Sequence, residues 1–518
     1  QLYGLYPICG KDSNLIKKFF YMNWSFKMSK NFITYEKFEQ FLEKQDKNVY
    51  DILKFIASSE KVSLTYEELY EITNLSVQTL YELLRKFIEI LPVIDKNQSL
   101  SVHIESYNCY SFHKKPSFTL DYYFAVFLRR SQYYRILIDL LYGKQRTIEQ
   151  YTEKLFISES SVKRTMKQLR GILDGFYLKI IKKNKKYLLV GDEEKIRYFY
   201  FILFKISSNA PDDLYSEESI KRIQTDFQKI YPNITQNTLE NFLYFLHVTK
   251  IRMAHDFRLQ AKENHFEVIN RLFTLKDFET QLGKYIFFND AMNNQVELEC
   301  LYFFISTDEL LTIETILSVS AYLSPAILSE EAFLIGNTIL YQLSQFFDIK
   351  FSPEEYFYLG ANFYLKIKKS EIFYYYHFEK KYLDKPIEKY INKLFSDFSK
   401  YFERNTGEKL PLPVDYLQLI LLEIFLEKDK KISVLVYSAL GDRDKVRIEK
   451  KLQKFITIPI RFVNRLEENP QLIISNRYLK SNQKIPIFYI RNYFMNTELN
   501  NISKFVEELY FLEKGYNQ

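Results

Sequence analysis

Basic side chains gather between Val162 and Val190, where nine lysines and arginines accompany a single acidic residue, Asp174. Cationic side chains at this density suit the phosphates of a nucleic acid, and serine, arginine and glutamine side chains can also bind base edges. The pattern therefore predicts binding to double-stranded DNA. The candidate contact residues of this segment are Ser160, Ser161, Lys163, Arg164, Lys167, Gln168, Lys182, Lys183, Lys185 and Lys186.

The residues that must position these side chains follow the pattern of a helix-turn-helix. An amphipathic helix is expected over residues 147–155, and residues 156–158 form a tight turn. Ser158 is a good N-cap for a second helix. Such a helix can enter the major groove of DNA with its exposed face, which carries the candidate contacts of residues 160–168. Its expected buried stripe is Val162, Met166 and Leu169.

A basic β-hairpin is expected directly after the second helix. The apolar runs 176–181 and 187–190 favour two strands, and the lysine-rich residues 182–186 lie between them. A hairpin in this place is a wing, which can contact the DNA backbone. Short helix pairs and solvated lysine hairpins also occur without DNA, so a single motif leaves a purely structural role open.

Residues 61–90 repeat this pattern. Thr65 and Ser76 are the expected caps of two helices, and a helix over 50–57 completes the bundle. Two copies about 85 residues apart indicate repeated modules. The first copy is less basic, so a protein-contact module is the alternative for it. Its expected buried residues are Leu80, Leu83, Leu84 and Phe87, and its candidate DNA contacts are Gln78, Thr79 and Tyr81.

Length and composition limit the classes of protein. A chain of 518 residues suggests roughly three to five domains. The net charge of +7 is small for this length, so nucleic-acid binding must come from local patches. Cys9, Cys109 and Cys300 form no CxxC pair, which argues against a disulfide framework or a zinc site. We find no apolar run of membrane-spanning length and no signal peptide, and we expect a cytoplasmic protein without a cofactor. Met28 is a candidate original start, with residues 1–27 a leader or an added segment.

The middle of the chain, residues 192–428, has helical periodicity almost throughout. It contains no glycine-rich phosphate loop and no metal-binding histidine pair, so we expect no catalytic residues and no metal site. The histidines His247, His255 and His265 lie in the first half of this region. Two sets of five helices are expected, over 192–204, 216–230, 238–257, 265–286 and 295–306, then over 308–324, 329–347, 352–368, 386–402 and 413–427.

After Lys428 the pattern alternates between strands and helices, which favours a small parallel sheet covered by helices. Pro459 places the second strand at an edge of the sheet. The loop at 437–443 after the first strand has one glycine and no cysteine, so a structural or dimerising role is favoured over phosphate binding or thiol chemistry. The expected strands are 431–438, 456–463, 472–475 and 485–490, and the expected helices are 442–455 and 499–513.

The order of these parts resembles the Mga/AtxA family of virulence regulators of Gram-positive bacteria. The motifs 155–164 (LFISESSVKR) and 75–80 (LSVQTL) look like the two DNA-binding segments of that family. The helical sets are similar to its PTS regulation domains (PRDs), and the last part is similar to an EIIB component of the sugar phosphotransferase system. The resemblance implies a mainly α, multidomain fold: an N-terminal extension (1–30), winged helix-turn-helix domains (31–110 and 111–191), PRD-like bundles (192–306 and 307–428) and an EIIB-like α/β domain (429–518).

This resemblance implies a DNA-binding transcriptional regulator, typically an activator, that forms a homodimer through the PRD-like and EIIB-like domains. It also implies HPr or other phosphocarriers as partners, and His247 is the best remaining match to a phosphorylated histidine of the family. The sequence departs from the family pattern at Phe304, where a histidine would be expected, and at 436–438, where the phosphate-carrying cysteine is absent. The alternative function is a protein-interaction scaffold of the phosphotransferase network without DNA binding.

Overall fold

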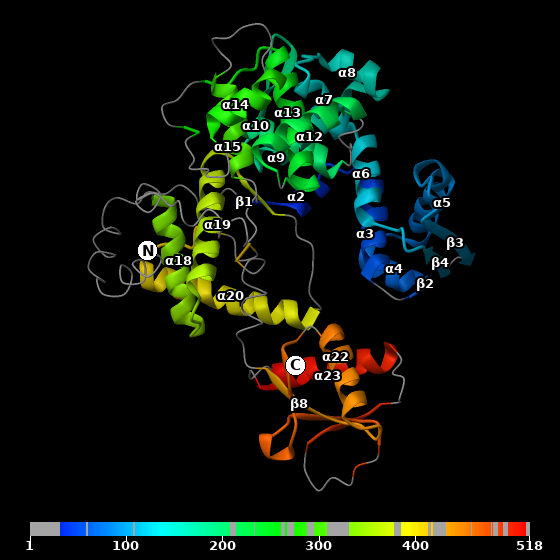
Figure 1. Cartoon of the computed structure of the whole chain (residues 1–518). Helices are drawn as coiled ribbons and strands as arrows, with labels where there is room; N and C mark the ends of the chain where they lie inside the picture. The colour runs from blue at the N-terminus through cyan, green and yellow to red at the C-terminus, as the bar shows by residue number, and fades with distance from the viewer. Residues whose placement is uncertain are drawn as a thin grey trace. The chain divides into compact units, whose positions relative to one another are not determined.

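A computed structural model of the chain shows a mainly helical protein, as the sequence predicts (Figure 1). The chain divides into two compact units, one comprising Gln1–Tyr341 with Phe351–Glu379 and the other Gln342–Lys350 with Lys380–Gln518. The expected N-terminal extension lies outside the described residues. The structure describes residues 32–58, 61–106, 109–207, 214–232, 234–260, 265–266, 274–286, 295–307, 331–377, 385–412, 416–417, 431–456, 458–477, 479, 485–490 and 496–513.

The first repeat, here called the first winged domain, has two helices joined by a short turn and followed by an antiparallel hairpin. Its sheet is antiparallel with the strand order β2-β4-β3. Pro92 lies inside α5, which continues past the predicted end at residue 90. The residues predicted to be buried in α5 are all buried. The elements are α3 (Lys44–Ser58), β2 (Ser63–Thr65), α4 (Tyr66–Thr73), α5 (Val77–Ile94), β3 (Leu100–Ser106) and β4 (Cys109–Lys114).

The second repeat has the same helix-turn-helix and a two-stranded wing, as predicted. Helix α9 contacts α7, α8 and β5, so it is held between the other helices and the wing. The wing strands extend into the lysine run. Lys182 and Lys183 end the first strand and Lys186 begins the second, whereas the predicted strands stop at residue 181 and resume at residue 187. The elements are α7 (Gln132–Leu141), α8 (Ile148–Leu155), α9 (Glu159–Asp174), β5 (Lys179–Lys183) and β6 (Lys186–Val190).

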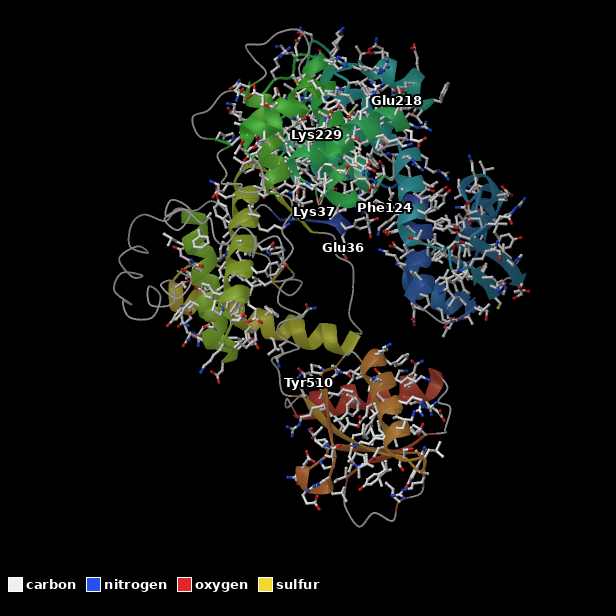
Figure 2. The ribbon with its side chains drawn as sticks, viewed as in Figure 1. Glu36, Lys37, Phe124, Glu218, Lys229 and Tyr510 are labelled. Atoms are coloured by element: carbon white, nitrogen blue, oxygen red, sulfur yellow. The ribbon has the colours of Figure 1, made fainter. Side chains whose placement is uncertain are left out.

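Helix α6 (Leu120–Arg130) connects the two winged domains, contacting α3 of the first and α7 of the second. Phe124 on α6 is fully buried, and its ring centroid lies 4.8 Å from that of Tyr35 and 5.4 Å from that of Tyr50 (Figure 2). Tyr35 begins the short helix α2 (Tyr35–Glu39), which follows β1 (Phe32–Thr34). Strand β1 pairs in parallel with β7 (Tyr375–His377), a contact between distant segments that the sequence pattern does not predict.

The helical region begins immediately after the wing. Helix α10 contacts both α13 and α6, and the Tyr200 hydroxyl donates to the Leu137 carbonyl at 2.7 Å. The predicted helix over 265–286 is wrong at its start, because His265 lies in a turn and the helix begins at Leu275, where Thr274 and Asp277 form a capping box. The elements are α10 (Glu193–Ile206), α12 (Glu217–Ile230), α13 (Gln236–Ala254), α14 (Leu275–Leu282), η3 (Gly283–Tyr285) and α15 (Gln295–Ser306).

Three further helices match members of the second predicted set. They are α18 (Glu331–Phe347), α19 (Pro353–Ile372) and α20 (Lys385–Thr406). Ser352 caps α19, and Pro353 occupies its first turn, where a missing N–H has no cost. The helices predicted over 308–324 and 413–427 lie outside the described residues, apart from residues 416–417.

The C-terminal part has the predicted α/β pattern. All its strand pairs are parallel in the order β11-β10-β8-β9, so β9 is at an edge as Pro459 predicts. Helices α22 and α23 contact β8 and each other, and they lie side by side over the sheet (Figure 1). The elements are β8 (Ile432–Tyr437), α22 (Asp442–Phe455), β9 (Ile460–Val463), β10 (Leu472–Ser475), β11 (Ile487–Tyr489) and α23 (Asn496–Glu513).

Candidate nucleic-acid interface

Local caps fix both ends of the turn between α8 and α9. Thr147 and Gln150 form a capping box at the start of α8. Phe156 ends α8 in the left-handed conformation, with φ of 56°. The Ser158 hydroxyl accepts a hydrogen bond from the Ser161 backbone N–H at 3.2 Å and so begins α9. The predicted buried stripe of α9 is confirmed, and the opposite face of the helix is left for contacts.

The exposed face of α9 presents most of the predicted contact residues to solvent. Lys163 is ion-paired with Glu159 at 2.7 Å, and this carboxylate raises the pKa of Lys163, so the lysine remains cationic at neutral pH. Gln168 is less available than predicted, because its side-chain carbonyl accepts a hydrogen bond from the Tyr133 hydroxyl at 2.9 Å. Ser161 is half-buried, and the exposed members of the set are Ser160, Lys163, Arg164, Lys167 and Gln168.

The wing ends in a tight two-residue turn. Asn184 and Lys185 both have positive φ, 50° and 65°, which is the geometry of the type I′ turns that suit a twisted hairpin. The four predicted lysines of the wing are all exposed. Arg170 attaches the wing to α9, since its Nε donates to the Ile180 carbonyl at 3.0 Å. The sequence gives no sign of this positioning role, because Arg170 resembles any other cation of the segment.

A buried carboxylate keeps two further cations out of the interface. Asp139 on α7 is 2% exposed, and it is ion-paired with Arg146 at 2.7 Å and with Lys154 at 2.6 Å. These pairs join α7 to α8 and to the segment before it. Some basic side chains of this domain therefore stabilise its fold and others are exposed at its surface. Only the tertiary structure distinguishes the two groups.

The corresponding face of the first winged domain is nearly neutral. Gln78 and Thr79 are exposed and Tyr81 is half-buried. The Gln78 amide donates to Glu82 at 3.4 Å, and Arg85 is ion-paired with Glu89 at 3.2 Å. The structure thus brings the predicted contacts of this domain together at the start of α5, but it surrounds them with balanced charge.

His247 lies on α13 between two aromatic rings. Its ring centroid is 5.7 Å from that of Phe204 and 5.8 Å from that of Tyr215. Burial, with a smaller effect of Lys250, lowers the pKa of His247 to about 4. The Nε2 atom is buried and has no hydrogen-bond partner among the described residues. The imidazole is therefore neutral at pH 7, but Nε2 is shielded from solvent.

The two positions where the sequence departs from the family pattern are filled by packing and hydrogen bonds. Phe304 is buried and stacks on Phe245 at 4.0 Å between ring centroids. In the C-terminal unit, the Ser438 hydroxyl after β8 donates to Asp444 at 2.6 Å, and the Ala439 N–H donates to Asn476 at 2.7 Å. The loop at 437–443 is thus hydrogen-bonded to the side chains of Asp444 on α22 and Asn476 after β10.

Metal sites and membrane-spanning helices are two further features that the described part of the chain could contain. No cluster of three or more histidine, cysteine, aspartate or glutamate side chains there could hold a metal ion. No helix among the same residues is both long and apolar enough to cross a membrane.

Comparison with known proteins gives one family. Residues 117–204 match the model of the Mga helix-turn-helix domain. The match contains α6–α9, the wing and nearly all of α10, so it extends past the boundary predicted at residue 191. Comparison with curated proteins gives no match.

Proposed function

We propose that the chain is a Mga-like regulator, because its residues 117–204 match the Mga helix-turn-helix domain, and that it is a homodimeric transcriptional activator acting on double-stranded DNA in the cytoplasm. The observation that carries the proposal is the basic surface of the second winged domain. Exposed Arg164 and Lys167 on α9 lie on the same domain as the exposed lysines of the wing. Cations on a helix and an adjoining hairpin match the phosphates that border a groove.

The contacts divide by type. Arg164 and Lys167 are the side chains that we assign to base edges, because they lie at the centre of the exposed face of α9. Ser160, in the first turn of the helix, is assigned to a phosphate. Lys182, Lys183, Lys185 and Lys186 of the wing, together with Lys163, are assigned to phosphates. Gln78, Thr79 and Tyr81 of the first domain are secondary contacts, since the charge around them is balanced.

A salt titration tests DNA binding. The intact protein is titrated against an A+T-rich duplex by filter binding at several salt concentrations. Phosphate contacts predict that the logarithm of the association constant falls linearly with the logarithm of the salt concentration, by about 0.9 for each phosphate neutralised. The absence of duplex binding at low salt would contradict the proposed function.

The alternative function is a scaffold that uses the winged domains for protein contacts. The double reversal Lys163→Glu and Arg164→Glu separates the two, because it should abolish DNA binding if α9 reads DNA. Lys221→Glu with Arg222→Glu is a matched control. It makes the same charge change on the exposed surface of α12. There Lys221 is ion-paired with Glu217 and Arg222 with Glu218, each four residues earlier in the helix (Figure 2).

Exposed apolar residues of the C-terminal α/β part support dimerisation there. Leu440, in the turn before α22, and Val446, within α22, are 62% and 45% exposed. The hydrogen bonds that occupy the adjoining loop favour self-association over phosphate transfer as the role of this part. We expect Leu440→Glu with Val446→Glu to shift the protein from dimer to monomer in sedimentation velocity. Val93→Glu, at an apolar position of the first winged domain that is 74% exposed, should leave the dimer intact.

Phosphorylation of His247 is the link that we propose to the sugar phosphotransferase system. A neutral imidazole is the nucleophilic form, and the low pKa keeps His247 neutral at pH 7. Because Nε2 is buried, transfer requires the ring to move away from Phe204 and Tyr215. The test is incubation with HPr, enzyme I and labelled phosphoenolpyruvate. If His247→Ala takes up as much label as the unaltered protein, His247 is not the acceptor.

A further inference from the structure

Helix α9 contains a glycine for which the folded chain offers no reason. Gly171 lies within the helix and is exposed. A Cβ atom placed on it would meet nothing within 4 Å among the described residues. Glycine inside a helix costs about 0.5–1 kcal/mol relative to alanine, because its backbone loses more conformational freedom on folding. The free protein would therefore be more stable with alanine at this position.

Gly171 continues the line of predicted contact residues. Ser160, Arg164, Lys167 and Gly171 are separated by four, three and four residues, so they lie along one face of the helix. This face is opposite the buried Val162. The glycine is thus on the surface that we assign to DNA and not on the surface that packs inside the domain.

The length of this line exceeds the width of the groove. Eleven residues separate Ser160 from Gly171, which corresponds to roughly 16 Å of helix at 1.5 Å per residue. The major groove is about 12 Å wide, so the two ends of the line reach the two phosphate backbones that border it. At the first end lie the helix N-terminus and the hydroxyls of Ser158, Ser160 and Ser161, which hydrogen-bond to one another in the free protein and can turn to a phosphate. At the other end of the line, Gly171 has no side chain that could contact the second backbone or keep it at a distance.

We propose that α9 crosses the major groove from one phosphate backbone to the other, and that Gly171 is the point where the second backbone approaches the helix most closely. This inference rests on the proposed DNA binding and adds the docking mode. Gly171 is a positioning residue in it. Its missing side chain lets the helix sit deep enough for Arg164 and Lys167 to reach base edges, and any Cβ there holds the helix away from DNA.

The test is a size series at one position. Gly171→Ala and Gly171→Leu both introduce good helix formers, so both variants should melt at or above the temperature of the unaltered protein. We expect duplex binding, measured by fluorescence anisotropy at low salt, to weaken about tenfold for the alanine variant, the loss of roughly one charge-assisted hydrogen bond. The leucine variant should bind more weakly still, with a salt dependence reduced by about one phosphate contact or more.

A control separates helix stability from docking. Thr225→Ala changes an exposed residue inside α12 to the best helix former and should leave DNA affinity unchanged. If the unaltered protein and both Gly171 variants bind duplex equally well, DNA binding stands and the docking mode is overturned. If the unaltered protein binds no duplex at low salt, the proposed function fails, and the docking mode fails with it.

Discussion

The two winged domains have the same local framework but different surfaces. In both, the turn residue has a left-handed conformation, Asn74 with φ of 53° and Phe156 with φ of 56°. In both, a serine caps the second helix through a hydrogen bond from the backbone three residues later. In both, a buried carboxylate, Glu39 or Asp139, is ion-paired with two basic side chains. The framework is therefore fixed by caps and buried charge, not by the ligand.

The surfaces differ in charge. Helix α9 has four basic and two acidic residues, whereas α5 has two of each. The wing of the second domain adds five lysines and no acid in β5, β6 and their turn, but the described strands of the first hairpin add only Lys114, offset by Glu105. Because the framework is shared and the surface charge is not, we expect DNA affinity to follow the surface charge of each domain. The following changes test this difference.

Among these changes, the largest effect is expected from neutralising the wing. Replacing Lys182, Lys183, Lys185 and Lys186 with glutamine should weaken duplex binding roughly a hundredfold at low salt and lower the salt dependence by about three to four units, because each phosphate contact is lost separately. Arg85→Gln with Lys86→Gln on α5 is the matched change in the first domain. Fluorescence anisotropy should show little effect of it. An equal loss from both sets would mean that the two domains bind DNA alike.

Removal of the buried carboxylate should destabilise the second domain. Asp139→Ala leaves Arg146 and Lys154 without their partner, and we expect the free energy of unfolding to fall by about 3 kcal/mol, the lower end for a buried pair because both cations are partly exposed. Urea denaturation followed by circular dichroism measures this. Lys154→Ala, which removes only one of the cations, should cost less. A neutral result for Asp139→Ala would show that the pairs are not part of the framework.

The first domain should respond to pH through Asp46. Burial raises the pKa of this carboxyl from 3.8 to about 6, against the opposing effect of Arg130 and with a further rise from Glu43. The folded state therefore keeps a proton that the unfolded chain releases, so stability falls as pH rises from about 4 to about 6, by roughly 2 kcal/mol. Asp46→Asn should flatten this part of the profile and be more stable than the unaltered protein at pH 7. Thermal melting across this range decides the point.

The smallest effect is expected at the turn. Phe156 is 91% exposed in a left-handed conformation that asparagine adopts more readily. Phe156→Asn should therefore raise the stability of the second domain by about 1 kcal/mol, and Asn74→Phe should lower that of the first by a similar amount. Melting temperatures of the two variants measure the difference. A fall for Phe156→Asn would show that the ring stabilises the folded domain after all.

Much of this molecule follows from the sequence alone. Ser158 and Thr147 begin helices because a short hydroxyl side chain satisfies free backbone N–H groups, whatever lies further away. The 3.6-residue spacing of Val162, Met166 and Leu169 fixes which face of α9 is buried, and thereby which side chains are exposed. The C-terminal alternation likewise predicts the parallel sheet with an edge strand at Pro459. These features depend only on neighbouring residues, and the structure confirms them.

Only the tertiary structure determines which polar side chains form hydrogen bonds or ion pairs within the protein and which remain available at the surface. Gln168 is bound by Tyr133, 35 residues before it, and Arg170 is bound by the wing. Asp139 selects Arg146 and Lys154 from many similar cations. Nothing in the spacing of these residues reports such pairs, because they form only when separate elements pack together. The same holds for the exposed Gly171, because the space around it depends on where the described elements of the fold lie.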